Sequence, residues 1–310
     1  MINQLVKHYW AWILGIMVLG ILPGYAAMLV TRVQLDTTVF HVAEQHTIDP
    51  TTVLNQLAQV NVVYLGEVHD RLADHQAQLE MIQALHQRRP NLAIGMEMFQ
   101  RPAQSSLNQY LGGQITEAQL RTLSQYDQRW GFDWEFYAPI LRFAKAHRLP
   151  VIALNTPSEI TRKVSRSGLE SLTPAEHQQI PPRSQIQLGP EAYRQRLQQF
   201  FTASHQQAGH SLTFERFFLA QVLWDETMAE QIAQTLQQSP DTLMVVLAGQ
   251  GHIAYGYGIP DRVLRRLQTQ PSFQGQFEQR LVLLNPDAEL RTPTKPKSAD
   301  YFWDAPAGNK

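Results

Sequence analysis

Two turns of the form Gly-x-x-His carry the side chains of this sequence that are best suited to chemistry. Residues 66–69 read GEVH and residues 249–252 read GQGH, and each turn directly follows an apolar run. Imidazoles and carboxylates exchange protons near neutral pH and also bind divalent metals. We therefore predict that Glu67, His69 and His252 belong to one site, with each glycine letting the chain leave its strand tightly.

Two further polar side chains end other apolar runs of the chain. Glu97 lies near the end of the run LAIGMEM, and Asn155 ends the run PVIALN. In an open parallel sheet, ligands bind beyond the carboxyl ends of the strands. The four segments therefore predict a rim that holds Glu67, His69, Glu97, Asn155 and His252.

The rim residues allow two kinds of catalysis. Glu67, His69, Glu97 and His252 are ligand types that suit zinc, manganese or iron, and a bound metal of this kind would activate water. Without a metal, the same residues would act as general acid and base. Each residue alone also has a structural explanation, as a cap or as half of an ion pair. No HExxH sequence is present, and the sequence leaves open whether the protein is an enzyme.

Three more ionisable residues are candidates for the same site. His75 follows Asp74, which we expect to cap the next helix. Asp225 and Glu226 lie in the apolar stretch FFLAQVLWDETMA, where a buried carboxylate needs a partner such as an arginine or a rim histidine. The alternative is that both carboxylates are paired elsewhere or face solvent.

The glycine-rich stretch HIAYGYG after the second turn adds Tyr255 and Tyr257. Tyrosine and histidine are both axial ligands of haem iron, and haem also needs an apolar slot and cations for its propionates. Packing of both rings over the sheet edge is the alternative. The same stretch matches the loose pattern G-x-G-x-x-A, but we expect a loop rather than a helix there. Because Gln270 also stands where an acid would bind a ribose, a dinucleotide site is excluded.

Strands that alternate with helices must position these side chains. The predicted strands are near-continuous apolar runs, and the predicted helices carry apolar residues at helical spacing. Strands are expected at residues 61–66, 92–98, 150–155, 242–249 and 280–285. Helices are expected at residues 50–59, 74–88, 102–111, 116–124, 135–148, 156–168 and 212–238. This pattern predicts an α/β protein with three layers, α/β/α, around a mainly parallel central sheet, with a helical insertion.

The insertion and the two ends of the chain complete the predicted organisation. Residues 170–211 are polar and rich in glutamine, and we interpret them as a helical lid. Residues 291–310 contain prolines and lysines with few apolar groups, so they are predicted to be a flexible tail. The domain itself is expected to cover residues 36–290.

The first residues have the order that is typical of an export signal. Lys7 precedes a run from Tyr9 to Leu22 in which every residue is apolar or glycine, and Pro23 follows. Residues 1–30 are therefore predicted to be a cleaved signal peptide or a membrane anchor through residues 9–30. The protein is expected to be periplasmic or held at the outer side of the cytoplasmic membrane.

Composition and charge exclude several classes of function. The 310 residues include 26 Lys and Arg against 27 Asp and Glu, so the net charge of -1 gives no basis for nucleic-acid binding. Cysteine is absent, which excludes disulfides, thiolate metal sites and a cysteine nucleophile. The basic cluster of Arg262, Arg265 and Arg266 is interpreted as a solvated helix face.

Several stretches together resemble the ChaN-like family, which is described as haem-binding. The matching stretches are VVYLGEVHD with His75, LAIGMEMFQR, DWEFYAPIL, PVIALN, FFLAQVLWDETMA and VVLAGQGHIAYGYGIPDR. The family is similar to a wider group with Tiki-type metalloproteases, TraB-like proteins and erythromycin esterases. Paired Gly-x-x-His turns and glutamates recur in that group, and they match Glu67, His69, Glu97 and His252 here. The acylatable cysteine of lipoprotein members is absent from this sequence.

The resemblance implies an exported protein that binds haem or a related tetrapyrrole and takes part in haem or iron handling. A homodimer is an expected state, because a haem that bridges two subunits would depend on it. Tyr255 or Tyr257 is expected to be the axial ligand of the haem iron, and the other residues expected around the haem are His252, His69, His75, Asn155, Asp225 and Glu226. The alternative function is a metal-dependent hydrolase, in which Glu67, His69, Glu97 and His252 hold a divalent metal such as Mn or Zn.

Overall fold

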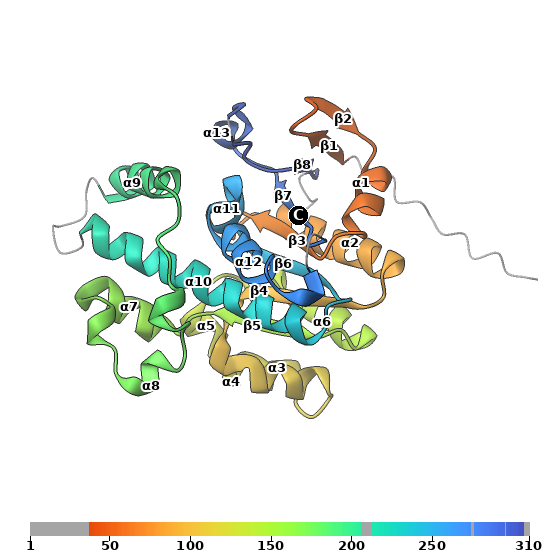
Figure 1. Cartoon of the computed structure of the whole chain (residues 1–310). Coiled ribbons are helices and arrows are strands. Elements are labelled where there is room, and N and C mark those ends of the chain that lie inside the picture. Colours follow the sequence, from red (N-terminus) through yellow and green to blue (C-terminus); the bar gives the residue numbers. More distant parts are fainter. Residues whose placement is uncertain (1–36, 206–212, 274–275, 295, 307–310) are drawn as a thin grey trace, which may run out of the picture. The chain divides into compact units, whose positions relative to one another are not determined.

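An eight-stranded sheet runs through the described part of the protein (Figure 1). The computed structural model describes residues 37–205, 213–273, 276–294 and 296–306. The strands are β1 (Thr38–His41), β2 (His46–Ile48), β3 (Val62–Glu67), β4 (Leu92–Gln100), β5 (Val151–Asn155), β6 (Leu243–Gly249), β7 (Gln279–Leu284) and β8 (Tyr301–Asp304). Their spatial order is β2-β1-β8-β7-β3-β6-β4-β5.

Most of the strands run in the same direction. Every neighbouring pair from β8 to β5 is parallel, whereas β1 is antiparallel to both β2 and β8. The predicted mainly parallel sheet is therefore confirmed, and it ends in an antiparallel edge. Because the parallel strands share a direction, their carboxyl ends meet along one side of the sheet.

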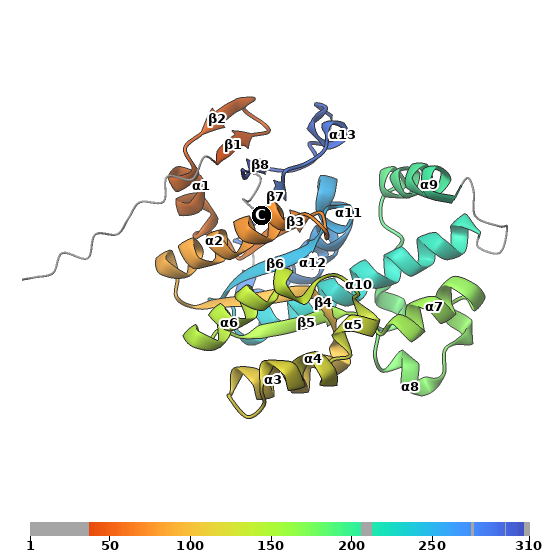
Figure 2. The same ribbon diagram turned by 180° about the vertical axis from the view of Figure 1, so that it is seen from behind.

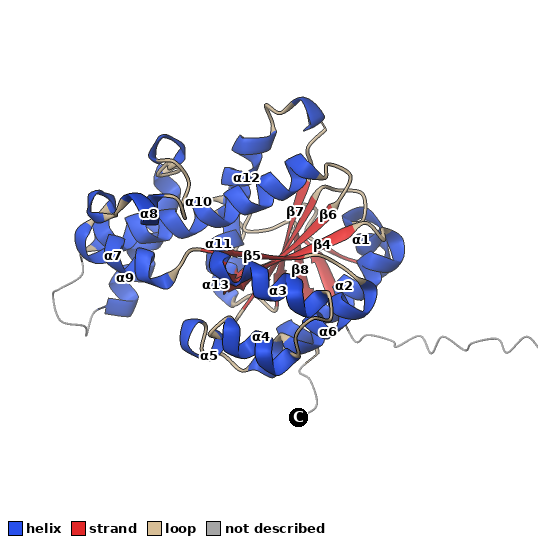
Figure 3. Ribbon diagram, turned by 90° about the horizontal axis from the view of Figure 1, so that it is seen from below, coloured by secondary structure: helices blue, strands red, loops and turns tan. Residues whose placement is uncertain are grey.

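Helices cover both faces of the sheet, which confirms the three-layer prediction (Figure 3). The α-helices that precede the insertion are α1 (Pro50–Leu57), α2 (Leu72–Arg88), α3 (Gln104–Leu111), α4 (Glu117–Leu123), α5 (Tyr126–Arg129) and α6 (Ala138–His147). Those that follow β5 are α7 (Ser158–Ser167), α8 (Pro174–His177), α9 (Glu191–His205), α10 (Phe214–Gln238), α11 (Gln250–Ile253), α12 (Ile259–Leu267) and α13 (Ala288–Arg291). Figure 2 shows α2 and α6 in front of the sheet, on the face opposite to α10 and α12.

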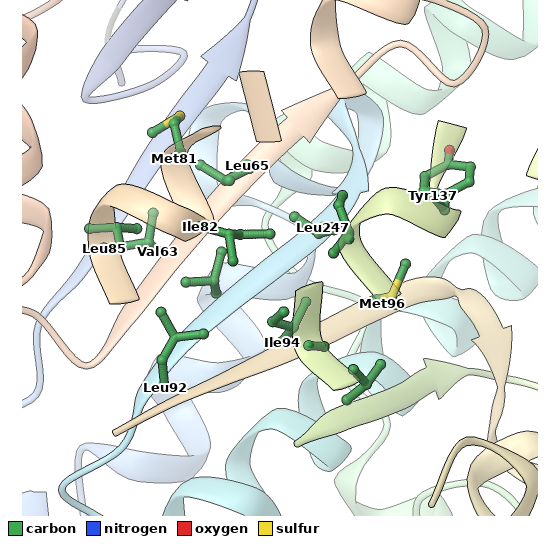
Figure 4. Packing of buried hydrophobic residues seen from close by; sticks show 14 of the residues in the cluster. Val63, Leu65, Met81, Ile82, Leu85, Leu92, Ile94, Met96, Tyr137 and Leu247 are labelled. Carbon is green, nitrogen blue, oxygen red and sulfur yellow. The ribbon is translucent and has the colours of Figure 1, made fainter. Parts of the chain in front are cut away.

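The central strands contribute side chains to two hydrophobic cores, one on each face of the sheet, because successive side chains of a strand point to opposite faces. In β3, Val63 and Leu65 belong to the core with α2 and α6, whereas Val62 and Tyr64 belong to the core with α10 and α12. Figure 4 shows the first of these cores, with Ile82 of α2 among the strand side chains. Burial on both faces explains why the strands read as continuous apolar runs.

The helical insertion lies between β5 and β6. Figure 1 shows α7, α8 and α9 gathered around the first half of α10, and α10 contacts both α7 and α9. The predicted lid, residues 170–211, corresponds to α8 and α9 with their connections, while its last residues, 206–211, lie outside the described residues. Its role as a lid stays a prediction.

The prediction of a flexible tail at residues 291–310 was wrong in its central part. Residues 301–304 form β8, which pairs with β1 on one side and β7 on the other. Tyr301, Phe302 and Trp303 are buried. Burial of these large aromatic side chains stabilises the strand, although prolines precede it in the sequence. The strands β1 and β2 were also missed, because segments of four and three residues are too short for a periodic signal.

The predicted signal peptide or anchor, residues 1–30, lies outside the described residues. In the part of the chain that the structure describes, no helix has the length and apolar character required to cross a bilayer.

Candidate functional site

The carboxyl ends of β3, β4 and β6 bring the predicted rim residues together. Glu67 is the last residue of β3, and Glu97 lies near the end of β4. His69 follows β3, and His252 lies in α11, the single helical turn after β6. The expectation of a loop without helix after β6 was therefore wrong. Gln250 at the start of this turn donates a side-chain hydrogen bond to the Leu284 carbonyl, 2.6 Å away, which ties the turn to the end of β7.

A buried carboxylate holds His69. The Nδ1 atom of His69 lies 2.8 Å from Oε1 of Glu67, which is itself 2% exposed. The same carboxylate accepts hydrogen bonds from the Tyr137 hydroxyl and from the Gln78 amide, both at 2.5 Å. A carboxylate with this many donors keeps a fixed orientation, so it fixes the imidazole ring that it contacts. No described residue bonds to Nε2 of His69, which leaves that nitrogen available to a ligand.

A second buried carboxylate holds His252. The Nδ1 atom of His252 lies 2.6 Å from Oδ1 of Asp225, and the Tyr193 hydroxyl donates to the other oxygen of Asp225. On its other side, Nε2 of His252 lies 3.4 Å from Oε1 of Glu97. Glu97 also accepts a hydrogen bond from the Gly249 amide at 2.8 Å. His252 is therefore clamped between two carboxylates.

The clamped arrangement sets the protonation of the site. Burial alone would lower the pKa of His252, but the charges of Glu97 and Asp225 raise that pKa well above its ordinary value. Burial would likewise raise the pKa of Glu97, but His252 and His69 lower it to about 2. Burial would also lower the pKa of His69, which the hydrogen bond to Glu67 and the charge of Glu97 raise instead. At neutral pH, Glu97 is thus a carboxylate beside an imidazolium at His252.

The glycines of the two turns serve a different purpose from the one expected. Gly66 lies within β3, and Gly249 is the last residue of β6 and the N-cap residue of α11; neither has a positive φ that would require glycine. A Cβ atom on Gly249 would lie 2.9 Å from the His69 ring, and one on Gly66 would lie 2.7 Å from the Leu283 side chain. The glycines are needed because neighbouring side chains approach the backbone closely.

A cavity of about 630 Å³ opens over this rim. Its floor contains Glu67, His69 and His252, and its opposite wall is the α9 face with Leu197, Phe200 and Ala203. Arg196 of α9 lies at the same cavity, 3.4 Å from Glu289, and its guanidinium stacks 4.7 Å from the Tyr255 ring. The volume falls in the range of small-molecule and cofactor sites. Arg196 is the only lysine or arginine in the described lining.

The predicted divalent metal site is not formed by the described residues. No group of three or more His, Asp or Glu side chains among them is arranged to hold a metal ion. The reason lies in the contacts of the carboxylates. Glu67 is occupied by His69, Tyr137 and Gln78, and Glu97 by His252 and the Gly249 amide. Metal ligation by Glu67, His69, Glu97 and His252 therefore has no support among the described residues and stays a prediction.

His75 and Asn155 lie behind the rim rather than in the cavity lining. The buried His75 ring lies 3.0 Å through Nε2 from the His69 carbonyl and stacks on Phe136. Asn155 donates a hydrogen bond to the Glu97 carbonyl at 3.0 Å. His75 thus fixes the backbone of His69, which lines the cavity, and Asn155 fixes the backbone of Glu97, which contacts His252.

Asp225 and Glu226 were expected near the haem, but both are fully buried and neither lines the cavity. Glu226 pairs instead with the three arginines of α12: Arg262 at 3.5 Å, Arg265 at 2.6 Å and Arg266 at 2.6 Å. The interpretation of these arginines as a solvated face was wrong. A buried glutamate on α10 requires cations, and α12 packs directly against α10.

Tyr255 and Tyr257 lie beside the cavity and not in its lining. Their rings stack with centroids 5.6 Å apart, and Tyr255 has a left-handed backbone with φ of 62°. Neither hydroxyl bonds to a described residue, and both side chains are half-buried. Tyr255 packs against the core with α10 and α12, whereas Tyr257 packs against the cluster of Tyr193, Phe218 and Val222.

Sequence reasoning missed four residues that complete the site. Tyr137, Gln78 and Tyr193 hold the two carboxylates, and Arg196 adds the cation. Gln78 lies one helical turn after Asp74, so its position on the inner face of α2 was accessible from spacing. The two tyrosines come from segments far from the turns in the sequence, and no local pattern marks them.

The chain was compared with known proteins. The family described as haem-binding uptake, Tiki superfamily, ChaN matches residues 53–263. The protein RETICULATA-RELATED 5, chloroplastic, of Arabidopsis thaliana is 25% identical over 282 residues, which cover 82% of this chain and 35% of that protein. The chain thus spans about a third of the length of that curated relative.

Solved structures share the fold. A structure of ChaN from Campylobacter jejuni, described by cofacial haem binding, has a TM-score of 0.67 at 16% identity, covering 86% of this chain and 96% of that chain. A mutant of the erythromycin esterase EreC in its open conformation has a TM-score of 0.44 at 14% identity, covering 75% and 72%. From the family match over residues 53–263, this chain belongs to the ChaN family of haem-binding uptake proteins in the Tiki superfamily.

Proposed function

We propose that this protein binds haem in the cavity beneath α9 and serves in the handling of haem, iron or a related tetrapyrrole. The observation that carries the proposal is the combination found in that cavity. The same cavity is lined by a carboxylate-oriented imidazole whose Nε2 bonds to no described residue (His69), by apolar side chains of α9 (Leu197 and Phe200) and by a guanidinium (Arg196). These are the three parts that a haem site needs: an axial ligand, an apolar slot and a cation for the propionates.

The residues present fit haem, and their roles can be assigned. His69 would ligate the iron through Nε2, while Glu67 on Nδ1 raises the basicity of the ring. Arg196 would pair with a propionate in place of Glu289, which is largely exposed and so gives a weak pair. Tyr255 and Tyr257 remain the alternative ligands, since their hydroxyls bond to no residue in the described part of the chain. The haem itself would supply the redox-active iron.

A haemin titration of the purified chain, followed at the Soret band, tests this proposal. We expect a saturable shift with a dissociation constant of about 1 μM or tighter. His69→Ala should weaken binding at least about tenfold, whereas His46→Ala, at an exposed position on β2, should not. Loss of the shift in Tyr255→Phe or Tyr257→Phe instead would move the ligand to the tyrosine pair. A flat titration would refute haem binding.

The role of Arg196 is tested with haemin and its dimethyl ester, which lacks free carboxylates. The wild-type protein should prefer haemin, because only haemin offers an anion to the guanidinium. Arg196→Ala should bind both compounds with similar affinity. If both proteins preferred haemin over the dimethyl ester to the same extent, Arg196 would not contact the propionates. Such a result would not count against haem binding itself.

We also propose a homodimer and an exported location. The Campylobacter jejuni relative is described by cofacial haem binding, that is, by haems that face each other. Haems from two copies of this chain would meet in the same way, so light scattering should show a larger particle when haemin is added. The order of residues 1–30 supports export to the periplasm or to the outer side of the cytoplasmic membrane.

A metal-independent hydrolase is the second candidate function. Its support is the pair of histidines, each with a carboxylate on Nδ1. His69 would take a proton from water through Nε2, and the His252 imidazolium would give a proton to the leaving group. A panel of nitrophenyl esters tests this candidate. Turnover that is lost in Glu67→Ala but retained in Tyr255→Phe would support it, and no turnover on any ester would count against it.

A further inference from the structure

The two site histidines are held by chains of hydrogen bonds with the same composition. In the first chain, Tyr137 donates to Glu67, which contacts Nδ1 of His69. In the second chain, Tyr193 donates to Asp225, which contacts Nδ1 of His252. Both tyrosines and both carboxylates are at most 2% exposed. Each histidine thus depends on a buried carboxylate that a tyrosine hydroxyl helps to hold.

The two chains of hydrogen bonds differ in the helix that supplies the tyrosine. Tyr137 lies at the start of α6, which packs on the sheet within the main hydrophobic core. Tyr193 lies in the first turn of α9, the helix of the insertion whose Leu197 and Phe200 line the cavity. The hydrogen bonds that hold His252 are therefore complete only while α9 packs against α10.

Buried polar contacts hold the start of α9 in place. The Arg262 guanidinium stacks 5.1 Å from the Tyr193 ring and donates to the Gln187 carbonyl at 3.2 Å. The Gln187 amide donates to Glu226 at 2.9 Å. Asp225 and Glu226 are neighbours on α10, so adjacent carboxylates hold the insertion, and Asp225 also holds His252. Among the described residues, the Tyr193 hydroxyl is the only atom of α9 that bonds to Asp225, so a shift of α9 would break this contact.

We propose that Tyr193 is a positioning residue through which α9 controls His252. Both oxygens of Asp225 are used, one by His252 and one by Tyr193. Removal of the tyrosine hydroxyl leaves a buried oxygen without a donor, which frees the carboxylate to turn away from His252. A ligand that presses on the cavity wall at α9 therefore changes the orientation of His252, and this last step alone rests on the proposed haem binding.

The test compares Tyr193→Phe with the matched variant Tyr137→Phe. Each removes one hydroxyl from one buried carboxylate and keeps the ring. In protein labelled with nitrogen-15 at histidine, the ring resonances of His252 should shift or broaden in Tyr193→Phe while those of His69 stay unchanged. Tyr137→Phe should do the reverse. Unchanged His252 resonances in Tyr193→Phe, in a protein whose amide spectrum is otherwise native, would overturn the inference.

The coupling to the ligand is measured by haemin dissociation. Tyr193→Phe should release haemin about tenfold faster, since the lost bond is to a charged group. Phe200→Ala removes cavity contact from the same helix, so it should also speed release but leave the His252 resonances in place. Movement of His252 in both variants would assign the effect to general loosening of α9 and overturn the role of Tyr193. If the wild-type protein binds no haemin, the proposed function fails, while the resonance comparison still decides the role of Tyr193.

Discussion

At the scale of single residues, the site depends on side chains that never reach the cavity. Asp74 is an example, because it accepts hydrogen bonds from the Val68 amide at 2.8 Å and from the Asn285 side chain at 2.7 Å. It thereby ties the segment that presents His69 to the end of β7. The sequence indicated Asp74 as a helix cap, which is a local role. Its partner Asn285 is 211 positions away along the chain, so only the fold joins them.

The pKa of Asp74 gives a prediction on stability. Burial raises this pKa to about 6, although the bonds from Asn285 and Val68 oppose the shift. The folded protein therefore keeps the proton in a range where the unfolded chain has lost it. Stability that is fully present below about pH 4 should decline as the pH rises through about 6, by roughly 3 kcal/mol from this group.

The measurement is urea unfolding of the wild type and of Asp74→Asn between about pH 4 and about pH 7. The free energy of unfolding of the wild type relative to the variant should fall across that range. Asp70→Asn, at an exposed neighbouring position, is the control and should show a constant difference. A constant difference for Asp74→Asn as well would mean that Asp74 does not titrate there.

At the scale of elements, α10 and α12 are joined by charge as well as by apolar contact. Glu226 of α10 is fully buried among the guanidiniums of Arg262, Arg265 and Arg266. Helical spacing placed these arginines on one face of a helix, and their number suggested a solvated face. Which face meets α10 follows from the packing of both helices on the sheet, so the sequence could not show the pairing.

Glu226→Gln should destabilise the protein by about 3 kcal/mol, because it leaves buried cations without an anion while it keeps the shape of the side chain. Thermal and urea unfolding measure this loss. Glu278→Gln removes the partner of Arg280 at a largely exposed ion pair and should cost less than about 1 kcal/mol. Equal effects of the two changes would show that the Glu226 cluster is hydrated and not a buried network.

At the scale of the whole molecule, strands from the two ends of the described chain pair with each other at one side of the sheet. The strand β1 pairs with β8, and β8 also pairs with β7 at the edge of the parallel region. This arrangement covers the edge of β7, which would otherwise present unpaired backbone groups. A segment that reads as a tail is therefore part of the sheet that carries the site.

Trp303→Ala tests how much β8 contributes to the stability of the fold. The side chain is 1% exposed and lies in the core with α1 and α2, so its loss should cost about 3–5 kcal/mol. The free energy of unfolding measures the loss, and Lys297→Ala, at a surface ion pair, serves as the control. A cost below about 1 kcal/mol for Trp303 would mean that β8 adds little to the fold.

The sequence by itself determined the layers, the central parallel strands and the residues at the strand ends. These features follow from patterns within one segment: continuous apolar runs for strands buried on both faces, helical spacing for the covering layers, and polar residues where a run stops. The resemblance of the same stretches to the ChaN-like family pointed to haem before any geometry was known.

Only the tertiary structure decided how the site is held. Whether Glu67 and Glu97 bind a metal or bind histidines depends on distances between strand ends, and these distances come from sheet register. Tyr137 and Tyr193 reach the site from α6 and α9, and the cavity exists because α9 returns to the rim. Such contacts join residues far apart in sequence, and their free energy depends on burial that no single segment specifies.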